Sequence, residues 1–322
     1  MKKSAIYLFA LLTLGAFTTC RRNDLKGIDF RKEMRQFVIE ISRTAREKNP
    51  DFIVIPQNGI ELVSLSEEAD GTLARDYLAA IDGHGQESLF YGYNADDQAT
   101  PTDESDYLLA YLERSQAHDK RILVTDYCAT TAKVPDSYAK NEQHAFVSFA
   151  ANSRQLDQIP STPIHHENAD TIDHLSKVRN FLYLINFQQF ATKQTFIEAV
   201  CATNYDLLIC DLFFDEVPFS SDEIAQLRRK ANGGQRLVIA YMSIGEAEDY
   251  RYYWQSSWKK YPPKWLEAEN PDWEGNYKVR YWEGEWQHII LYSYLERIQK
   301  ANFDGVYLDI IDAFDYFEDL IQ

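Results

Sequence analysis

The sequence predicts an α/β fold, a (β/α)8 TIM barrel that is circularly permuted so that the N-terminal helix covers the last strand. Three observations lead to this prediction. Short apolar runs recur along the chain, amphipathic helical patterns separate them, and the last run, FDGVYLDIID (303–312), is followed by only ten residues. The helix expected after that run must therefore come from another part of the chain.

Eight apolar runs have the length and composition of buried parallel strands, and eight such units suggest a closed barrel. They are DFIVIPQNG (51–59), YLAAIDGHG (77–85), RILVTDYC (121–128), FLYLINFQQ (181–189), YDLLICDLFF (205–214), RLVIAYMSIGEAED (236–249), YKVRYW (277–282) and FDGVYLDIID (303–312).

Helical patterns lie between these runs. In SSDEIAQLRRKANGG, Ser220 and Glu223 form a capping box, and the two glycines that follow end the helix. In WQHIILYSYLERIQKAN, one side of a helix would carry Ile289, Tyr292, Leu295 and Ile298.

The segment 29–48 supplies the missing helix. At helical spacing, one face of it carries Phe30, Met34, Phe37, Val38, Ile41 and Ala45. In a closed barrel the chain ends can fall in any connection, because the two sides of the cut remain neighbours in space.

The first residues have the pattern of an export signal. Lys2 and Lys3 precede an apolar run, 5–17, which is shorter than the roughly 20 residues of a membrane-spanning helix. The residues before Cys20 resemble the processing site of bacterial lipoproteins, and ordinary cleavage nearby is the alternative. We expect a signal peptide at 1–19, a lipid-anchored linker at 20–28 and one barrel domain at 29–322, held at the cell envelope on the periplasmic side or the cell surface.

Composition narrows the possible partners. Without Lys2 and Lys3 the chain has 31 basic and 50 acidic side chains, a net charge of 31 − 50 = −19, which repels nucleic acid and favours cationic partners. Apart from Cys20 only three cysteines remain, so no disulfide framework is expected. No CxxC or HExxH spacing occurs, and His165 and His166 lie in a polar stretch, so we expect no metal site, no cofactor and a monomer.

Seven stretches, in one cyclic order that begins near residue 180, resemble glycoside hydrolase family 114, the endo-α-1,4-polygalactosaminidase-like barrels. They are YDLLICD, AYMSIGEAEDYRYYW, VRYWEGEWQ, FDGVYLDIID, DFIVIPQNGIEL, IDGHGQESLFY and RILVTDYC. The family runs from FLYLINFQQ to RILVTDYC without interruption, whereas this chain is cut after FDGVYLDIID. The resemblance covers nearly all of the chain after the signal, except roughly 160–178, and implies a (β/α)8 barrel that hydrolyses galactosamine-containing polysaccharide.

Glycosidic bond cleavage needs two carboxyl groups, and barrel active sites lie where the strands end. Alternation in GVYLD turns Asp309 toward the barrel interior, although it could instead cap a helix or pair with an arginine. Asp312 is expected to start the next helix. The resemblance implies Glu87 as the second catalytic carboxylate, on a loop that Gly83 and Gly85 would bend over the site, and an exposed loop glutamate is the alternative.

A third carboxylate, Asp211, closes LLICD and is expected to bind substrate or to take part in catalysis, with a structural salt bridge as the alternative. Asp309 and Glu87 lie on strands separated by one other strand. Their carboxyl groups should therefore be roughly 5 to 9 Å apart, a range that includes retaining and inverting enzymes.

Substrate binding is assigned to polar and aromatic residues near the same strand ends. The family's site wall resembles SIGEAEDYRYYW, although Glu246 and Arg251 could simply pair with each other, and Trp254, Trp273 and Trp282 are candidate stacking platforms or core residues. The full set is Tyr241, Glu246, Arg251, Trp254, Trp282, Gln57, Asn58, Asp82, Asp126 and Tyr127.

The expected function is that of a glycosidase, endo-acting, that cleaves a galactosamine-containing polysaccharide by carboxylate acid/base catalysis. A non-catalytic surface glycan-binding lipoprotein is the alternative. A metal-dependent hydrolase or deacetylase would need clustered histidines at the strand ends, where the sequence places only His84. Expected partners are the polysaccharide and, through Cys20, the membrane.

Overall fold

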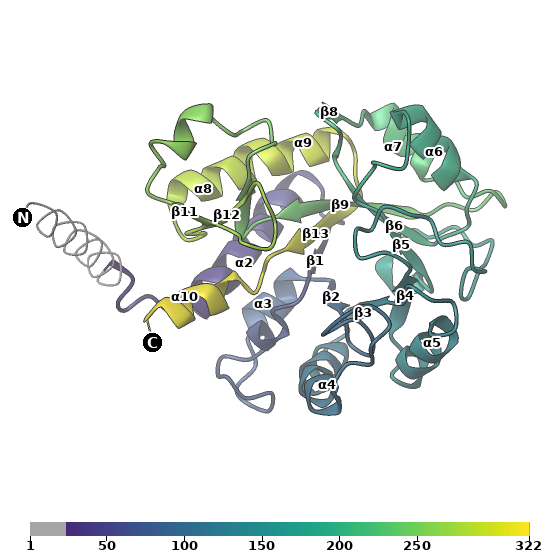
Figure 1. Ribbon diagram of the computed structural model, residues 1–322, viewed down its shortest axis with the longest axis horizontal. Helices are drawn as coiled ribbons and strands as arrows, with labels where there is room; N and C mark the ends of the chain where they lie inside the picture. Colours follow the sequence, from purple (N-terminus) through teal and green to yellow (C-terminus); the bar gives the residue numbers. More distant parts are fainter. Residues whose placement is uncertain (1–23, 322) are drawn as a thin grey trace, which may run out of the picture.

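The computed structural model describes residues 24–321 (Figure 1). The expected signal peptide at 1–19 and the lipidation residue Cys20 lie outside the described residues, so the signal, the anchor and the division into linker and barrel domain stay predictions. Among the described residues, the helices all fall short of the length and apolar character that crossing a bilayer requires.

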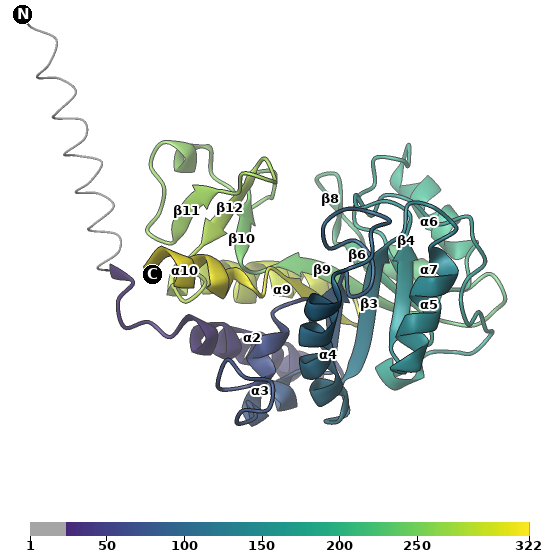
Figure 2. The same cartoon turned by 60° about the horizontal axis from the view of Figure 1, so that its bottom comes forward.

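Parallel strands form two sheets with helices around them (Figures 1 and 2). The larger has the order β1-β13-β9-β6-β5 and the smaller the order β2-β3-β4. Their bounds are β1 (Ile53–Pro56), β2 (Gly83–Glu87), β3 (Arg121–Tyr127), β4 (Val147–Ala151), β5 (Phe181–Tyr183), β6 (Leu207–Asp211), β9 (Leu237–Ser243) and β13 (Gly305–Asp309).

The two sheets meet at both sides without a continuous ladder. Beside β1 and β2, the described residues form one isolated parallel bridge, between Gln57 and Gly85. On the other side β4 lies next to β5, and no ladder between these two strands is found in the described part of the chain. The fold is therefore mixed α/β with parallel sheets, and closure of the eight strands into a barrel stays a prediction.

The expected strands differ from the observed ones in three places. The run YKVRYW is not a barrel strand, because β12 (Asn276–Val279) pairs antiparallel with β10 (Glu246–Glu248) and β11 (Leu266–Glu269) in a separate sheet. The eighth parallel strand is β4, which we did not expect. The run 77–85 was placed too early, because its first half forms α3 (Arg75–Ala80).

The N-terminal helix, α2 (Phe30–Lys48), lies beside the last helix, α10 (Ala313–Ile321), on the β1–β13 side of the larger sheet (Figure 1). The expected apolar face of α2 is buried. The Arg31 guanidinium pairs with the Glu318 carboxylate at 3.0 Å, and the rings of Phe30 and Phe317 stack with centroids 5.5 Å apart. The described ends of the chain are therefore neighbours, whereas the circular permutation itself stays a prediction.

The remaining helices lie around the two sheets (Figures 1 and 2). They are α4 (Thr102–Gln116), α5 (Val134–Gln143), α6 (Lys193–Cys201), α7 (Ser221–Leu227), α8 (Gly284–Ile289) and α9 (Leu295–Lys300), with short 3-10 turns η1 (Ile60–Val63), η2 (Leu175–Lys177) and η3 (Ser256–Lys259), and a small hairpin of β7 (Phe213–Phe214) and β8 (Val217–Pro218). The capping box of Ser220 and Glu223 at the start of α7 is confirmed.

Between α8 and α9 the helix contains a π-helical turn, η4 (Ile290–Tyr294). A π-turn adds a residue to the helical repeat and so shifts the buried face by one position. Tyr292, which we expected on the buried face, is 54% exposed, and its neighbours Leu291 and Tyr294 are buried instead.

Candidate active site

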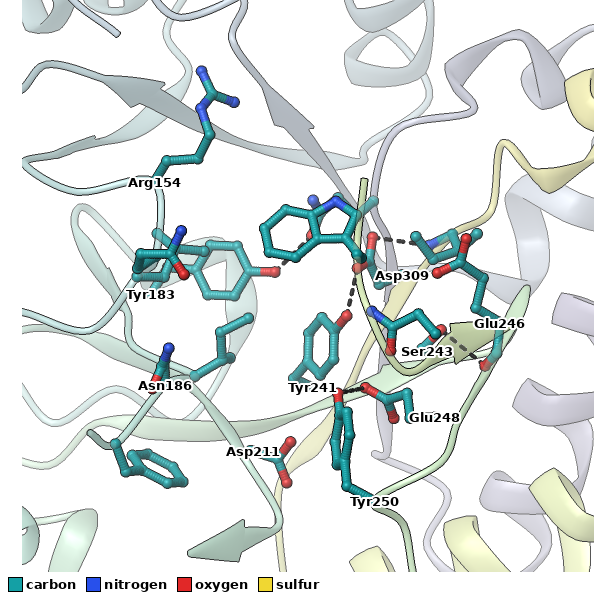
Figure 3. Close-up of a pocket in the computed structure, with 18 of the residues that line it drawn as sticks. Arg154, Tyr183, Asn186, Asp211, Tyr241, Ser243, Glu246, Glu248, Tyr250 and Asp309 are labelled. Carbon is teal, nitrogen blue, oxygen red and sulfur yellow. Dashed lines mark hydrogen bonds between the residues drawn. The ribbon is translucent and has the colours of Figure 1, made fainter. Parts of the chain in front are cut away.

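Seven parallel strands bring their C-terminal ends to one open cavity of about 630 Å³ (Figure 3). Barrel-type folds place reacting groups at this edge, because the loops that leave the strands converge there. The wall residues at these strand ends, or directly after them, are Gln57, Glu87, Tyr127, Tyr183, Asp211, Ser243 and Asp309.

Asp309 is the last residue of β13 and points into the cavity (Figure 3). One carboxylate oxygen, Oδ2, accepts a hydrogen bond of 2.5 Å from the Tyr241 hydroxyl, and Oδ1 accepts one of 2.8 Å from the Ile310 backbone N–H. Burial and the nearby charge of Glu87 raise the pKa of Asp309 to about 8, and the two hydrogen bonds oppose this rise. Asp309 can therefore carry a proton at neutral pH.

Glu87 closes β2 and lines the same cavity. Its Oε1 accepts a short hydrogen bond from the Tyr127 hydroxyl, and its Oε2 lies 3.5 Å from the Asn58 side-chain nitrogen. Asn58 also accepts a hydrogen bond of 3.1 Å from the Glu87 backbone N–H, and its own backbone is left-handed, with φ of 58°. A rigid turn after β1 thus holds the carboxylate from two directions.

The alternatives for these residues were a helix cap or an arginine pair for Asp309 and an exposed loop position for Glu87. None of these is found in the described part of the chain. Within residues 24–321, no ion pair involves Asp309 or Glu87, and both carboxyl groups line the cavity. The expected bending role of the glycines is wrong, because Gly83 and Gly85 both lie within β2. A Cβ on Gly85 would stand 1.9 Å from the Tyr307 hydroxyl oxygen, so this glycine makes room for the tyrosine ring below the site.

Asp211 also reaches the cavity, but in a buried ion pair. Its two carboxylate oxygens accept hydrogen bonds of 2.9 and 2.5 Å from Arg251, which bonds at 2.5 Å through Nε to Glu248. Burial raises the pKa of Asp211, and Arg251 opposes that rise. The salt-bridge alternative therefore describes its contacts, and a catalytic role for Asp211 stays a prediction.

The alternative for Glu246, a pair with Arg251, is not found among the described residues. Glu246 Oε1 instead accepts from Asn270 at 2.8 Å and pairs with Lys278 at 2.6 Å, across the sheet of β10 and β12. Asp312 lies at the start of α10, as expected, and it also lines the cavity. Burial, followed by the Asp315 charge, raises the pKa of Asp312 to about 7.

Four expected substrate-binding residues do not line the cavity: Asp82, Asp126, Trp254 and Trp282. Asp82 is at the beginning of β2, the opposite end from the cavity, where it accepts from Arg46 and from the Val54 backbone. Asp126 is buried, and both of its oxygens already accept hydrogen bonds from the loop after β2 and from α5.

The two tryptophans serve packing. The Trp254 ring contacts Trp258 and Tyr277, at centroid distances of 5.3 and 4.8 Å. The Trp282 ring contacts Phe30 and Phe317, and so joins α2 to α10. Trp273, another candidate platform, does line the cavity and is 48% exposed.

Several wall residues were not expected from the sequence. Tyr183 donates a hydrogen bond of 2.8 Å to Gln57, and the Arg154 guanidinium lies 4.0 Å from the centre of the Tyr127 ring. Tyr183 could have been found from its position at the end of a predicted strand. Arg154 could not, because it follows β4, a strand that was not predicted. Other such residues are Asn186, Phe187, Asp215, Ser243 and Glu248.

Comparison with known proteins agrees with the family that the sequence resembles. Residues 187–321 match the model of glycoside-hydrolase family GH114, a stretch that contains Asp211, Glu246 and Asp309. Similar proteins include uncharacterized proteins of Methanocaldococcus jannaschii (42% identical over 153 residues, 47% of this chain and 42% of the relative), Deinococcus radiodurans (45% over 122 residues, 38% of each) and Thermotoga maritima (52% over 79 residues, 24% of each). The chain thus spans less than half the length of these curated relatives.

A solved structure, that of Aspergillus fumigatus Ega3 in complex with galactosamine, is 21% identical to this chain. It covers 49% of this chain and 50% of its own, with a TM-score of 0.28. The family match covers β6, β9, β13 and their connections, and over residues 187–321 the chain is similar to glycoside hydrolase family GH114.

Proposed function

We propose that this protein is a glycoside hydrolase that cleaves a polysaccharide with Asp309 and Glu87 as its catalytic pair. One observation carries this function: two carboxyl groups from different sheets meet in one open cavity, and one of them has its pKa raised to about 8. A glycosidase needs a protonated and an ionised carboxyl group on opposite sides of the scissile bond. The family match of the segment that holds Asp309 supports the same assignment.

In this mechanism Asp309 is the proton donor. Its proton passes to the glycosidic oxygen while the bond between that oxygen and the sugar carbon breaks, and the Tyr241 hydroxyl stabilises the carboxylate that remains. Glu87, held by Tyr127 and Asn58, either attacks the sugar carbon or activates water. Water finally supplies the hydroxyl of the new reducing end and returns a proton to the pair.

The substrate we propose is a polysaccharide that contains galactosamine with free amino groups. The cavity wall carries seven carboxyl groups and two guanidinium groups, Arg154 and Arg251. A wall with this charge concentrates cationic chains near the site, and an amino sugar polymer is cationic at neutral pH. The enzyme cleaves bonds within the polysaccharide rather than at its ends.

We also infer that the eight parallel strands close into one barrel and that the chain is circularly permuted. The parallel strands are, in chain order, β1 to β6, β9 and β13, and the last of them pairs with the first, as closure of a barrel requires. The bridge from Gln57 to Gly85 and the position of β4 beside β5 support closure. A permuted chain would also match a family model in one part only.

The place of action remains a proposal from the sequence. An export signal at 1–19 and lipidation of Cys20 would hold the barrel at the bacterial cell envelope, where extracellular polysaccharide is available. Metabolic labelling with a palmitate analogue tests this: the wild-type protein should be labelled, and a Cys20→Ser variant should not.

The experiment that tests the function is incubation of the full chain with a panel of galactosamine-containing and other polysaccharides, scored by new reducing ends and by product size. Variants Asp309→Asn and Glu87→Gln are compared with Asp106→Asn, an exposed position on α4 outside the cavity. Wild-type protein and the control should release oligosaccharides of mixed length, and the two site variants should not.

The same panel separates catalysis from glycan binding. If the wild-type chain binds a polysaccharide by affinity electrophoresis but releases no reducing ends from any member of a broad panel, the protein is a glycan-binding lipoprotein. Equal activity of Asp309→Asn and wild-type protein would show that the catalytic pair lies elsewhere.

A further inference from the structure

The connection between β4 and β5, residues 152–180, is unusual for this fold. Where other connections contain a helix, this one contains only the short turn η2. Loops longer than about 12 to 15 residues without secondary structure are uncommon in compact domains unless something holds them. Contacts with neighbouring elements must therefore hold this connection in place.

A network of hydrogen bonds that ends in a buried ion pair fixes the middle of the connection. The side-chain amides of Asn168 and Asn180 donate to the backbone carbonyl of His166 at 3.1 and 3.0 Å. Asn168 also donates to Asp206, which pairs at 2.5 Å with the buried Lys230. His166 itself has a left-handed backbone, with φ of 53°, a conformation that costs free energy and is kept only where contacts impose it.

These contacts bring two imidazoles and a carboxylate together. Available ligand atoms of Glu142, His165 and His166 all lie within 4.8 Å of one another. The distance from His166 Nε2 to Glu142 Oε1 is 3.3 Å. The His165 ring stacks on Tyr138, at 4.3 Å between centroids and 11° between planes, and Tyr138 and Glu142 are one turn apart on α5.

We propose that Glu142, His165 and His166 bind one divalent transition-metal ion of the zinc type, which fastens the β4–β5 connection to α5. Imidazole nitrogen and carboxylate oxygen are the ligands that Zn²⁺ accepts, and three protein ligands leave a fourth position for water. The ion is structural, because none of the three residues lines the cavity.

One further feature agrees with a metal ligand set. Glu142 and His166 are both exposed, which leaves a path for the ion. The sequence alone did not suggest the site, since Glu142 is far from the histidine pair in the chain and belongs to no metal motif.

The alternative is a plain ion pair between Glu142 and a protonated His166, and a titration distinguishes the two. The full chain is treated with EDTA, dialysed and titrated with ZnCl₂ by calorimetry, while Tm and the rate of tryptic cleavage within 152–180 are followed. We expect one bound Zn²⁺ per chain, a higher Tm and slower cleavage, with no such effect from MgCl₂.

Variants assign the effect to the three residues. His165→Ala, His166→Asn and Glu142→Gln should each weaken Zn²⁺ binding by more than about tenfold, while His174→Ala, an exposed histidine of the same connection, leaves it unchanged. Asparagine is used at 166 because it tolerates the left-handed backbone. Absence of Zn²⁺ binding to the wild-type chain, or equal binding by the three variants, overturns the proposal.

Discussion

Two sets of carboxyl groups line the same cavity, and they differ in their partners. Asp211 and Glu248 share one guanidinium, that of Arg251, in a buried cluster. Asp309 and Glu87 accept hydrogen bonds mainly from the hydroxyls of Tyr241 and Tyr127. Figure 3 shows Asp211 and Asp309 at separate points of one wall.

The two sets of carboxyl groups therefore serve different purposes in one site. Both oxygens of Asp211 accept hydrogen bonds from Arg251, so this carboxylate ties the loop after β10 to the end of β6. Asp309 has no cationic partner among the described residues, and burial beside Glu87 keeps it protonated near neutral pH. A carboxyl group without a neutralising cation is the one that can give a proton to a substrate.

The largest expected effect concerns the proton donor. Asp309→Asn should lower kcat/KM on polysaccharide by about 10²- to 10⁴-fold, the usual contribution of general acid catalysis. On an aryl glycoside whose leaving group needs no proton, the same variant should lose less than about tenfold, because protonation is no longer required. Initial rates on the two substrates measure this difference.

Glu87→Gln is the matched comparison for that experiment. In the proposed mechanism Glu87 acts on the sugar carbon or on water, so its loss should lower the rate on both substrates alike. If Glu87→Gln loses activity on polysaccharide only and Asp309→Asn loses it on both substrates, Glu87 is the acid and Asp309 acts on the sugar carbon or on water.

The second effect concerns the paired carboxylates. Arg251→Met leaves Asp211 and Glu248 buried without their cation, which should lower the free energy of unfolding by about 3 to 5 kcal/mol. Urea denaturation measures it. The control, Arg43→Met, removes an exposed pair with Glu40 and Glu47 and should cost less than about 1 kcal/mol. Equal losses of unfolding free energy in the two variants would show that the Arg251 cluster does not stabilise the fold.

The third effect concerns how the stability of the fold depends on pH. The pKa of Asp309 is about 8 in the folded state and near 3.8 when the chain unfolds, so the folded state binds the extra proton between these values. The contribution of Asp309 to the free energy of unfolding is therefore fully present below pH 4 and is lost as the pH rises through 8. Asp309→Asn should raise Tm by roughly 2 °C or more at pH 9 and change it little at pH 4, as scanning calorimetry would show. A lower Tm at pH 9 would contradict the raised pKa.

The smallest effect is at the exposed rim. Trp273→Ala should raise KM about two- to tenfold with kcat within about twofold, because a stacking contact worth roughly 0.5 to 1.5 kcal/mol is lost from substrate binding. Tyr261→Ala, exposed but outside the cavity, is the control. If the two variants have the same KM, Trp273 is not a substrate platform.

Much of the fold could be predicted because buried strands and amphipathic helices have local signatures. The apolar face of α2 and the capping box of α7 are examples. β4 was missed because VSFAA is a short run with two small residues and one hydroxyl, which does not stand out as apolar. YKVRYW was misassigned because a strand in a small antiparallel sheet has the same alternation as a strand in a parallel one.

Position along a strand predicted Asp309 and the family resemblance predicted Glu87, and both line the cavity. Asp82 was assigned wrongly because the start of β2 was placed too early, which exchanged the two ends of the strand. The pairing of Arg251 with Asp211 depends on a contact between residues 40 positions apart, and the extra residue in η4 depends on packing. Neither can be read from local sequence.

In the proposed mechanism Asp309 is a protonated acid that works together with Glu87, and the pH dependence of kcat/KM shows where Asp309 loses its proton. The wild-type chain should lose activity on the alkaline side with an apparent pKa of about 8, as Asp309 gives up its proton. In Asp309→Asn, the residual activity on the aryl glycoside should lack this alkaline decline. A wild-type profile that stays level to pH 10, or a decline near pH 8 that persists in the variant, would contradict the account.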